Sequence, residues 1–155
     1  MTDAEKKLLL EDLCARLPYG VKVSIIAHNI DYEEDFGKTI IAELTGIQTA
    51  KDDDDITYPC FVTCYDKYKT QGNDIETIKP YLRPMSSMTE REKEEFQYIA
   101  WGKILETTIV RLEFGLSFKT VADIEDWLNA HHFDYRGLIP MGLALEAPEV
   151  LYITE

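Results

Sequence analysis

The sequence predicts an α+β fold: a small antiparallel sheet or SH3-like barrel with an N-terminal helix and C-terminal helices. Apolar residues recur at helical spacing near the N-terminus, alternate with polar residues in the middle of the chain, and return to helical spacing near the C-terminus. The chain has 155 residues, and no stretch of linker-like composition divides it. Because this length is common for one domain, we predict a single domain over residues 1–155.

The sequence predicts a helix over residues 3–16, with a cap at its start, apolar residues at helical spacing along it and helix-ending residues after it. Thr2 and Glu5 have the spacing of a capping box, in which each side chain bonds the backbone of the other residue. Leucines then recur every four residues, at Leu9, Leu13 and Leu17. Pro18 and Gly20 follow, and residues of these types end helices.

Three or four short strands are predicted between Val21 and Leu82. Alternation or β-branched composition marks residues 21–25, 38–48 and 61–65, and a short fourth strand falls within residues 75–82. Polar segments predict turns or loops between them, at residues 29–37, 51–55 and around Gly72 and Asn73. Pro80 has no N–H for a ladder bond, so it must end the fourth strand or place it at an edge. Hairpin spacing of this kind is typical of an antiparallel meander or a small SH3-like barrel.

Two further helices are predicted in the second half of the chain. Thr89 and Glu92 repeat the capping-box pattern and open a helix that runs to about Ala100. Thr120 with Asp123 is predicted to cap the next helix. Its apolar stripe consists of Val121, Ile124, Trp127 and Leu128.

The segments around these helices are less regular. Residues 104–114 are compatible with a strand or a helix, and their β-branched residues favour a strand. Gly137, Pro140 and Gly142 predict turns. Residues 150–153 are predicted to add an edge strand.

The composition narrows the classes of partner. The chain has 16 basic and 29 acidic residues, a net charge of −13. Binding to a phosphate backbone requires clustered Lys and Arg, and the chain has no such cluster, so nucleic acid is disfavoured as a partner. An acidic surface suits a basic protein partner, or a site that normally holds nucleic acid, and it also serves solubility alone. Since the chain shows neither a signal peptide nor a membrane-spanning apolar run, we expect a cytoplasmic protein.

Three cysteines, Cys14, Cys60 and Cys64, are too few for a disulfide framework. On a strand, Cys60 and Cys64 would lie about 13 Å apart. That separation is too large for a disulfide or a shared zinc ion. Because the neighbours of all three are apolar or aromatic, we expect buried free thiols.

Two histidines follow the last predicted helix. His131 and His132, with Asp134 and the nearby Glu125 and Asp126, are residue types that a metal-dependent enzyme would use. Adjacent helical residues point about 100° apart, however, so neighbouring histidines seldom share one ion. We favour the interpretation that they complement the dipole at the helix C-terminus, and we predict no metal and no cofactor.

The acidic clusters lack the features of catalytic or calcium sites. Asp52–Asp55 has neither the alternation nor the glycine of a calcium loop, so it predicts a solvated loop or an acidic contact for a basic partner. Residues 33–35, or Glu106 with Glu113, could supply paired carboxylates, but no pattern orients them across a pocket. With no nucleophile motif or phosphate-binding glycine loop either, the sequence predicts a protein that is not an enzyme.

Aromatic and arginine residues give the best candidate for an interface. Tyr81, Arg83 and Met85 fall on one predicted loop, and Tyr135 and Arg136 on another. Tyr, Arg and Met are enriched in protein interfaces, so these five are the predicted partner-binding residues. The alternative is that the aromatic and Met side chains pack between sheet and helices while each arginine pairs with an acid.

Two long runs resemble a known group of proteins. They are residues 78–89, which contain KPYLRPMSSMT, and residues 126–139, DWLNAHHFDYRGLI, continued by GLALEAP at 142–148. These runs, and the sequence LPYG at 17–20, are similar to a family of small uncharacterised proteins carried by phages and mobile elements of gut anaerobic bacteria. The resemblance implies a phage accessory role and brings no activity, cofactor or catalytic residue with it.

The leading hypothesis is therefore a non-enzymatic phage or mobile-element accessory protein that acts by protein–protein binding. One alternative is a nucleic-acid-binding protein that uses the small barrel. The other is a metal-dependent enzyme that uses His131 and His132.

Overall fold

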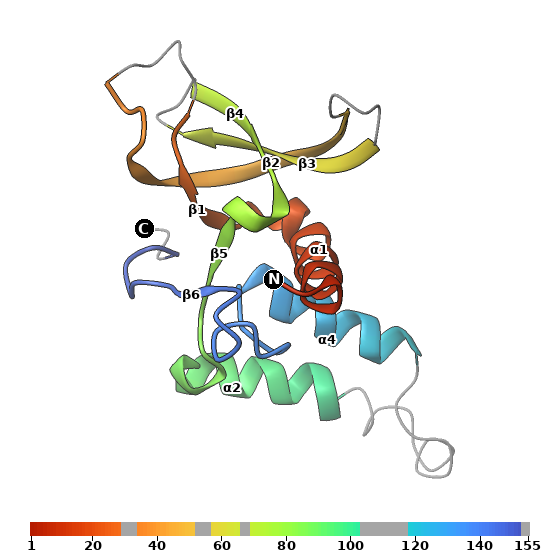
Figure 1. Ribbon diagram of the computed structural model, residues 1–155. Helices are drawn as coiled ribbons and strands as arrows, with labels where there is room; N and C mark the ends of the chain where they lie inside the picture. The colour runs from red at the N-terminus through yellow and green to blue at the C-terminus, as the bar shows by residue number, and fades with distance from the viewer. Residues whose placement is uncertain (29–33, 52–56, 66–68, 103–117, 153–155) are drawn as a thin grey trace. The chain divides into compact units, whose positions relative to one another are not determined.

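The structure, a computed structural model, describes all residues except 29–33, 52–56, 66–68, 103–117 and 153–155 (Figure 1). Contacts divide the chain into two compact units, unit 1 with residues 1–82 and 136–155, and unit 2 with residues 83–135. An N-terminal helix, a mostly antiparallel sheet and later helices confirm the α+β class. The single domain stays a prediction, because a compact packing unit need not fold independently.

Helix α1 (Asp3–Arg16) confirms the first predicted helix, including its capping box. The Glu5 carboxylate accepts from Thr2 N at 2.6 Å, and the Thr2 hydroxyl accepts from Glu5 N at 3.3 Å. A 3-10 turn, η1 (Leu17–Tyr19), follows the helix. Gly20 then reverses the chain at φ +65°, a left-handed conformation that glycine adopts without strain.

The sheet of unit 1 is built mainly from a meander. Six strands belong to it within the described residues: β1 (Lys22–Ile26), β2 (Thr39–Lys51), β3 (Thr57–Tyr65), β4 (Lys69–Asn73), β5 (Lys79–Leu82) and β6 (Leu145–Glu146). The first four pair in succession as antiparallel neighbours, and the spatial order is β4-β3-β2-β1-β5-β6 (Figure 1). The antiparallel pairing of the first three predicted strands is confirmed, but the predicted fourth strand, β5, pairs with β1 and not with β3.

A β-bulge divides the long strand β2. The pairing with β3 shifts register between Leu44 and Gly46, and the bulged Thr45 donates its hydroxyl to Val62 O at 3.2 Å. An extra residue moves later side chains to the opposite face. Before the bulge the even-numbered Leu44 is buried in the core, and after it the odd-numbered Ile47 packs against the same core.

The loop predicted around Gly72 and Asn73 is wrong, because both residues belong to β4. The Asn73 side chain is buried and donates to Thr63 Oγ1 at 2.9 Å and to Phe61 O at 3.2 Å. Gly72 leaves room for a neighbouring strand, since a Cβ there would lie 2.6 Å from the sulfur of Cys60.

Pro80 does not end β5, and β5 as a whole lies between β1 and β6, but Pro80 itself has a pairing partner on the β1 side alone. It pairs with Val23 of β1, while the parallel pairing with β6 starts one residue later, at Tyr81. Each ladder of β5 is only two residue pairs long. Strand β5 can therefore contain Pro80, which has no N–H, although other strands pair with β5 on both sides.

The C-terminal part of unit 1 confirms the predicted turns and corrects the predicted edge strand. Gly137 and Gly142 have φ values of +74° and +72° in the turns. Residues 150–152 form a turn rather than a strand, and the edge strand is β6. The Tyr152 hydroxyl accepts from the backbone N–H of β1 at 3.0 Å and donates to a β5 carbonyl at 2.7 Å. Ile153 lies outside the described residues.

Unit 2 contains helix α2 (Glu90–Gln97), a π-helical turn η5 (Tyr98–Gly102) and helix α4 (Phe118–Ala130). The predicted capping box of α2 is confirmed. Thr120 is not a cap, because it lies inside α4 and is buried, and Val121 is exposed rather than part of the apolar stripe. The core of this unit contains Met88, Leu128 and Phe133. The ambiguous segment 104–114 lies outside the described residues.

Of the helices in the described part of the chain, none combines the length and the apolar character that crossing a membrane requires.

Candidate protein-binding site

The two adjacent histidines are placed by the end of helix α4. His132 has φ +58°, and its N–H bonds Asn129 O at 3.1 Å while Phe133 N bonds Leu128 O at 3.0 Å. These two bonds form a Schellman motif, in which His132 occupies the left-handed position that glycine usually takes. His131 Nδ1 donates to a carbonyl of the last helical turn at 2.9 Å.

These contacts agree with the helix-terminus interpretation of the histidines. Among the described residues, no three His, Cys, Asp or Glu side chains come close enough to hold a metal ion. The cysteines agree only in part with the prediction: all are free, Cys60 is buried, Cys64 is partly buried, and Cys14 is exposed.

The acidic segment before β2 is engaged with β4. Lys69 Nζ lies 2.8 Å from Glu34 and 2.6 Å from Asp35. The hydrogen bond from Lys69 lowers the pKa of Asp35, and the two carboxylates raise the pKa of Lys69. Glu33, the aspartate run 52–55 and the pair Glu106 and Glu113 lie outside the described residues.

The predicted interface residues of unit 2 mostly serve its internal packing. Arg83 donates to both carboxylate oxygens of Glu92, at 2.7 and 2.9 Å, and its guanidinium lies 4.3 Å from the centre of the Phe133 ring. Arg83 is the main reason that the pKa of Glu92 falls to about 2. Tyr135 packs against the apolar core, whereas Met85 is exposed.

The other two predicted interface residues belong to unit 1. Arg136 lies 3.6 Å from Asp12 and 3.7 Å from Glu11 on α1. Tyr81 is partly buried in β5, where its carbonyl accepts a bond from Tyr152. The five predicted residues therefore do not form one surface within either unit.

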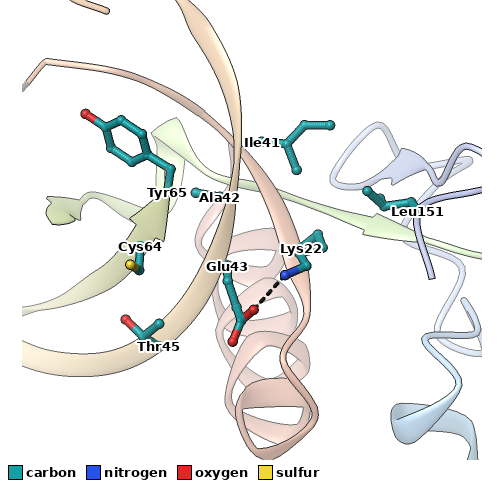
Figure 2. Close-up of a pocket in the computed structure, with 8 residues that line it drawn as sticks. All are labelled: Lys22, Ile41, Ala42, Glu43, Thr45, Cys64, Tyr65 and Leu151. Atoms are coloured by element: carbon teal, nitrogen blue, oxygen red, sulfur yellow. Dashed lines mark hydrogen bonds and ion pairs between the residues drawn. The ribbon is translucent and has the colours of Figure 1, made fainter. Parts of the chain in front are cut away.

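A hollow of about 340 Å³ lies on the outer face of β1 and β2 in unit 1. Figure 2 shows Lys22 and Glu43 pointing toward each other from these neighbouring strands, with 2.6 Å between Nζ and Oε2. Ile41, Cys64 and Leu151 contribute to the lining of the hollow. The ammonium of Lys22 and the carboxylate of Glu43 neutralise each other, and Ile41 and Leu151 give the hollow an apolar part.

A groove of about 410 Å³ lies on unit 2, and nothing in the sequence patterns predicted it. It is lined by Glu94 and Glu95 from α2, Tyr98 and Ile99 from η5, and Trp127 from α4. The Tyr98 side chain is 61% exposed, which is unusual for a large aromatic residue. Inserting a π-turn after α2 shifts the helical phase of the residues that follow, and an α-helical pattern cannot anticipate this shift.

The groove combines an apolar lining with carboxylates. Within the described residues Glu94 has no ion-pair partner, and Glu95 shares an exposed contact of 3.1 Å with Arg91. Asp123 precedes Trp127 by one turn on the same face of α4. The groove is therefore an aromatic and aliphatic surface with negative charge beside it. No protein-family model, curated protein or solved structure matches the chain.

Proposed function

We propose that the protein acts by binding another protein, without catalysing a reaction, as an accessory protein of a phage or mobile element. The observation that carries this proposal is the groove of unit 2, where Tyr98, Ile99 and Trp127 lie beside Glu94 and Glu95. Exposed aromatic residues surrounded by a polar rim are typical of protein-binding surfaces. The similarity of two sequence runs to proteins of phages and mobile elements supports the biological setting.

The net charge of −13 supports a protein partner rather than a nucleic acid. A phosphate backbone would be repelled by this charge, whereas a basic protein surface would be attracted to it. The cytoplasm of the host, where such a partner would be encountered, is part of the same proposal.

The proposal is tested by affinity capture from lysate of a host bacterium. The wild-type protein should retain one partner at near-equal stoichiometry, and Tyr98→Ala should lose it. Phe36→Ala is the matched control, because Phe36 is an equally exposed aromatic residue, 60% against 61%, and lies in unit 1. Repeated capture of no stoichiometric partner, or equal capture by both variants, would count against the proposal.

A further inference from the structure

The groove of unit 2 also indicates what kind of segment it receives. We infer that its occupant is a basic amphipathic segment of the partner, in which Lys or Arg residues flank bulky apolar side chains. This inference rests on the proposed function and adds the chemistry of the partner.

The lining of the groove is largely aromatic and aliphatic. A volume of about 410 Å³ accommodates a few apolar side chains and is near the lower limit for small-molecule pockets. Trp127 is held in place by other rings: His131 at 4.0 Å, Phe96 at 5.6 Å and Phe133 at 5.7 Å between centroids. A fixed aromatic residue loses little entropy when it is covered, which is a property of binding hot spots.

The carboxylates at the groove favour a basic partner. Glu94 and Glu95 belong to the lining of the groove. Of the four Lys and Arg residues that the structure describes in unit 2, three have carboxylate partners: Arg91 contacts Glu95, Lys93 contacts the first residue of α2, and Arg83 is held by Glu92, whereas Lys119 of α4 is exposed. A Lys or Arg supplied by the partner would therefore find carboxylates beside an exposed Tyr98, whose ring also attracts cations.

A second copy of the chain fits the groove less well than a basic partner. In a symmetric dimer across this surface, Glu94 and Glu95 of one copy would face the same residues of the other. Like charges that face each other across an interface are destabilising.

The test uses a synthetic 18-residue peptide of Leu and Lys, with the leucines on one helical face. A peptide of the same composition with dispersed leucines is the first comparison, and a Leu and Glu peptide is the second. Binding is followed by the fluorescence of Trp127 in a Trp101→Phe background, where it is the only tryptophan. We expect saturable binding of the first peptide, at least about tenfold weaker binding of the other two, and weaker binding at higher salt.

Two pairs of variants separate the groove from the general charge of the protein. Glu94→Lys should weaken binding of the first peptide by about fivefold. Glu146→Lys, which makes the same change in net charge at an exposed residue of β6 in unit 1, should have almost no effect. Tyr98→Ala should weaken binding of the first peptide by about tenfold, and Phe36→Ala should leave this binding unchanged. Far-ultraviolet circular dichroism checks that each variant is folded, and Glu94→Gln replaces Glu94→Lys if that variant is not.

Equal effects of Glu94→Lys and Glu146→Lys, or equal binding of the dispersed-leucine peptide, would overturn the inference. If the peptides fail while Tyr98→Ala still abolishes capture of a natural partner, only the chemistry assigned to the occupant is wrong. If Tyr98→Ala leaves that capture intact, the proposed function of the groove fails as well.

Discussion

Replacing Glu92 by Gln isolates the contribution of one charge to the stability of unit 2. Glu92 is the third residue of α2, and its carboxylate accepts from Thr89 N at 2.8 Å as part of the capping box. The same carboxylate binds both terminal nitrogens of Arg83. Only 16% of its side chain is exposed. Gln also serves in capping boxes, so Glu92→Gln keeps the cap and removes the charge.

The pKa of Glu92 sets both the size and the pH range of the effect. It is lowered from 4.5 to about 2, chiefly by the hydrogen bond from Arg83. That difference corresponds to at most about 3 kcal/mol of folding free energy, and partial solvent screening reduces it to about 1–2 kcal/mol. Because the folded state holds the carboxylate ionised, this stabilisation is fully present above pH 4.5. It is lost as the pH falls toward 2.

The measurement is urea-induced unfolding of wild type and Glu92→Gln between pH 7 and pH 2. Both tryptophans of the chain, Trp101 and Trp127, belong to unit 2, so their fluorescence reports on this unit. We expect Glu92→Gln to be less stable by about 1–2 kcal/mol at pH 7 and nearly as stable as wild type at pH 2.

Glu5 provides a matched control for this experiment. It has the same capping-box role in α1, but its carboxylate bonds only Thr2 among the hydrogen-bonding groups of the described residues. Glu5→Gln should therefore have a smaller effect on the unfolding free energy, measured by circular dichroism. A destabilisation by Glu92→Gln that stays constant down to pH 2, or that Glu5→Gln equals, would refute the assigned role of the Arg83 ion pair.

Three further substitutions test the packing of unit 1, each by urea unfolding followed by circular dichroism. Asp12→Ala removes the bonds of 2.8 and 3.0 Å to the fully buried Arg16, and should cost more than about 1 kcal/mol. A smaller cost would contradict the pairing. Gly72→Ala should cost about 1–3 kcal/mol of unfolding free energy, because the new methyl group contacts the Cys60 sulfur. Adding Cys60→Ala should restore part of this loss. If it restores nothing, the strain lies elsewhere. Tyr152→Phe removes both hydrogen bonds of the Tyr152 hydroxyl to the backbone and should cost about 1–3 kcal/mol. An unchanged midpoint of unfolding would exclude a role for this hydroxyl.

The sequence predicted best those elements whose stabilising contacts are local. Both capping boxes were predicted because each joins residues only three positions apart. Strand β4 was missed because its polar side chains are satisfied by distant groups. Gln71, for example, donates to Ile26 O at 2.9 Å and accepts from His28 N at 3.1 Å. A buried amide and a solvated one look the same in a sequence, so polar composition alone predicted a loop.

The five interface residues stay a prediction, but the composition of the chain explains where the two arginines among them lie. With 29 acidic residues against 16 basic ones, a basic side chain finds a carboxylate more readily than a carboxylate finds a base. Arg83 and Arg136 accordingly lie beside carboxylates of their own units. Carboxylates such as Glu94 are what remains without an ion pair in the described part of the chain. In a strongly acidic protein, an exposed aromatic residue beside such carboxylates is therefore a better indication of a binding surface than an aromatic residue beside an arginine.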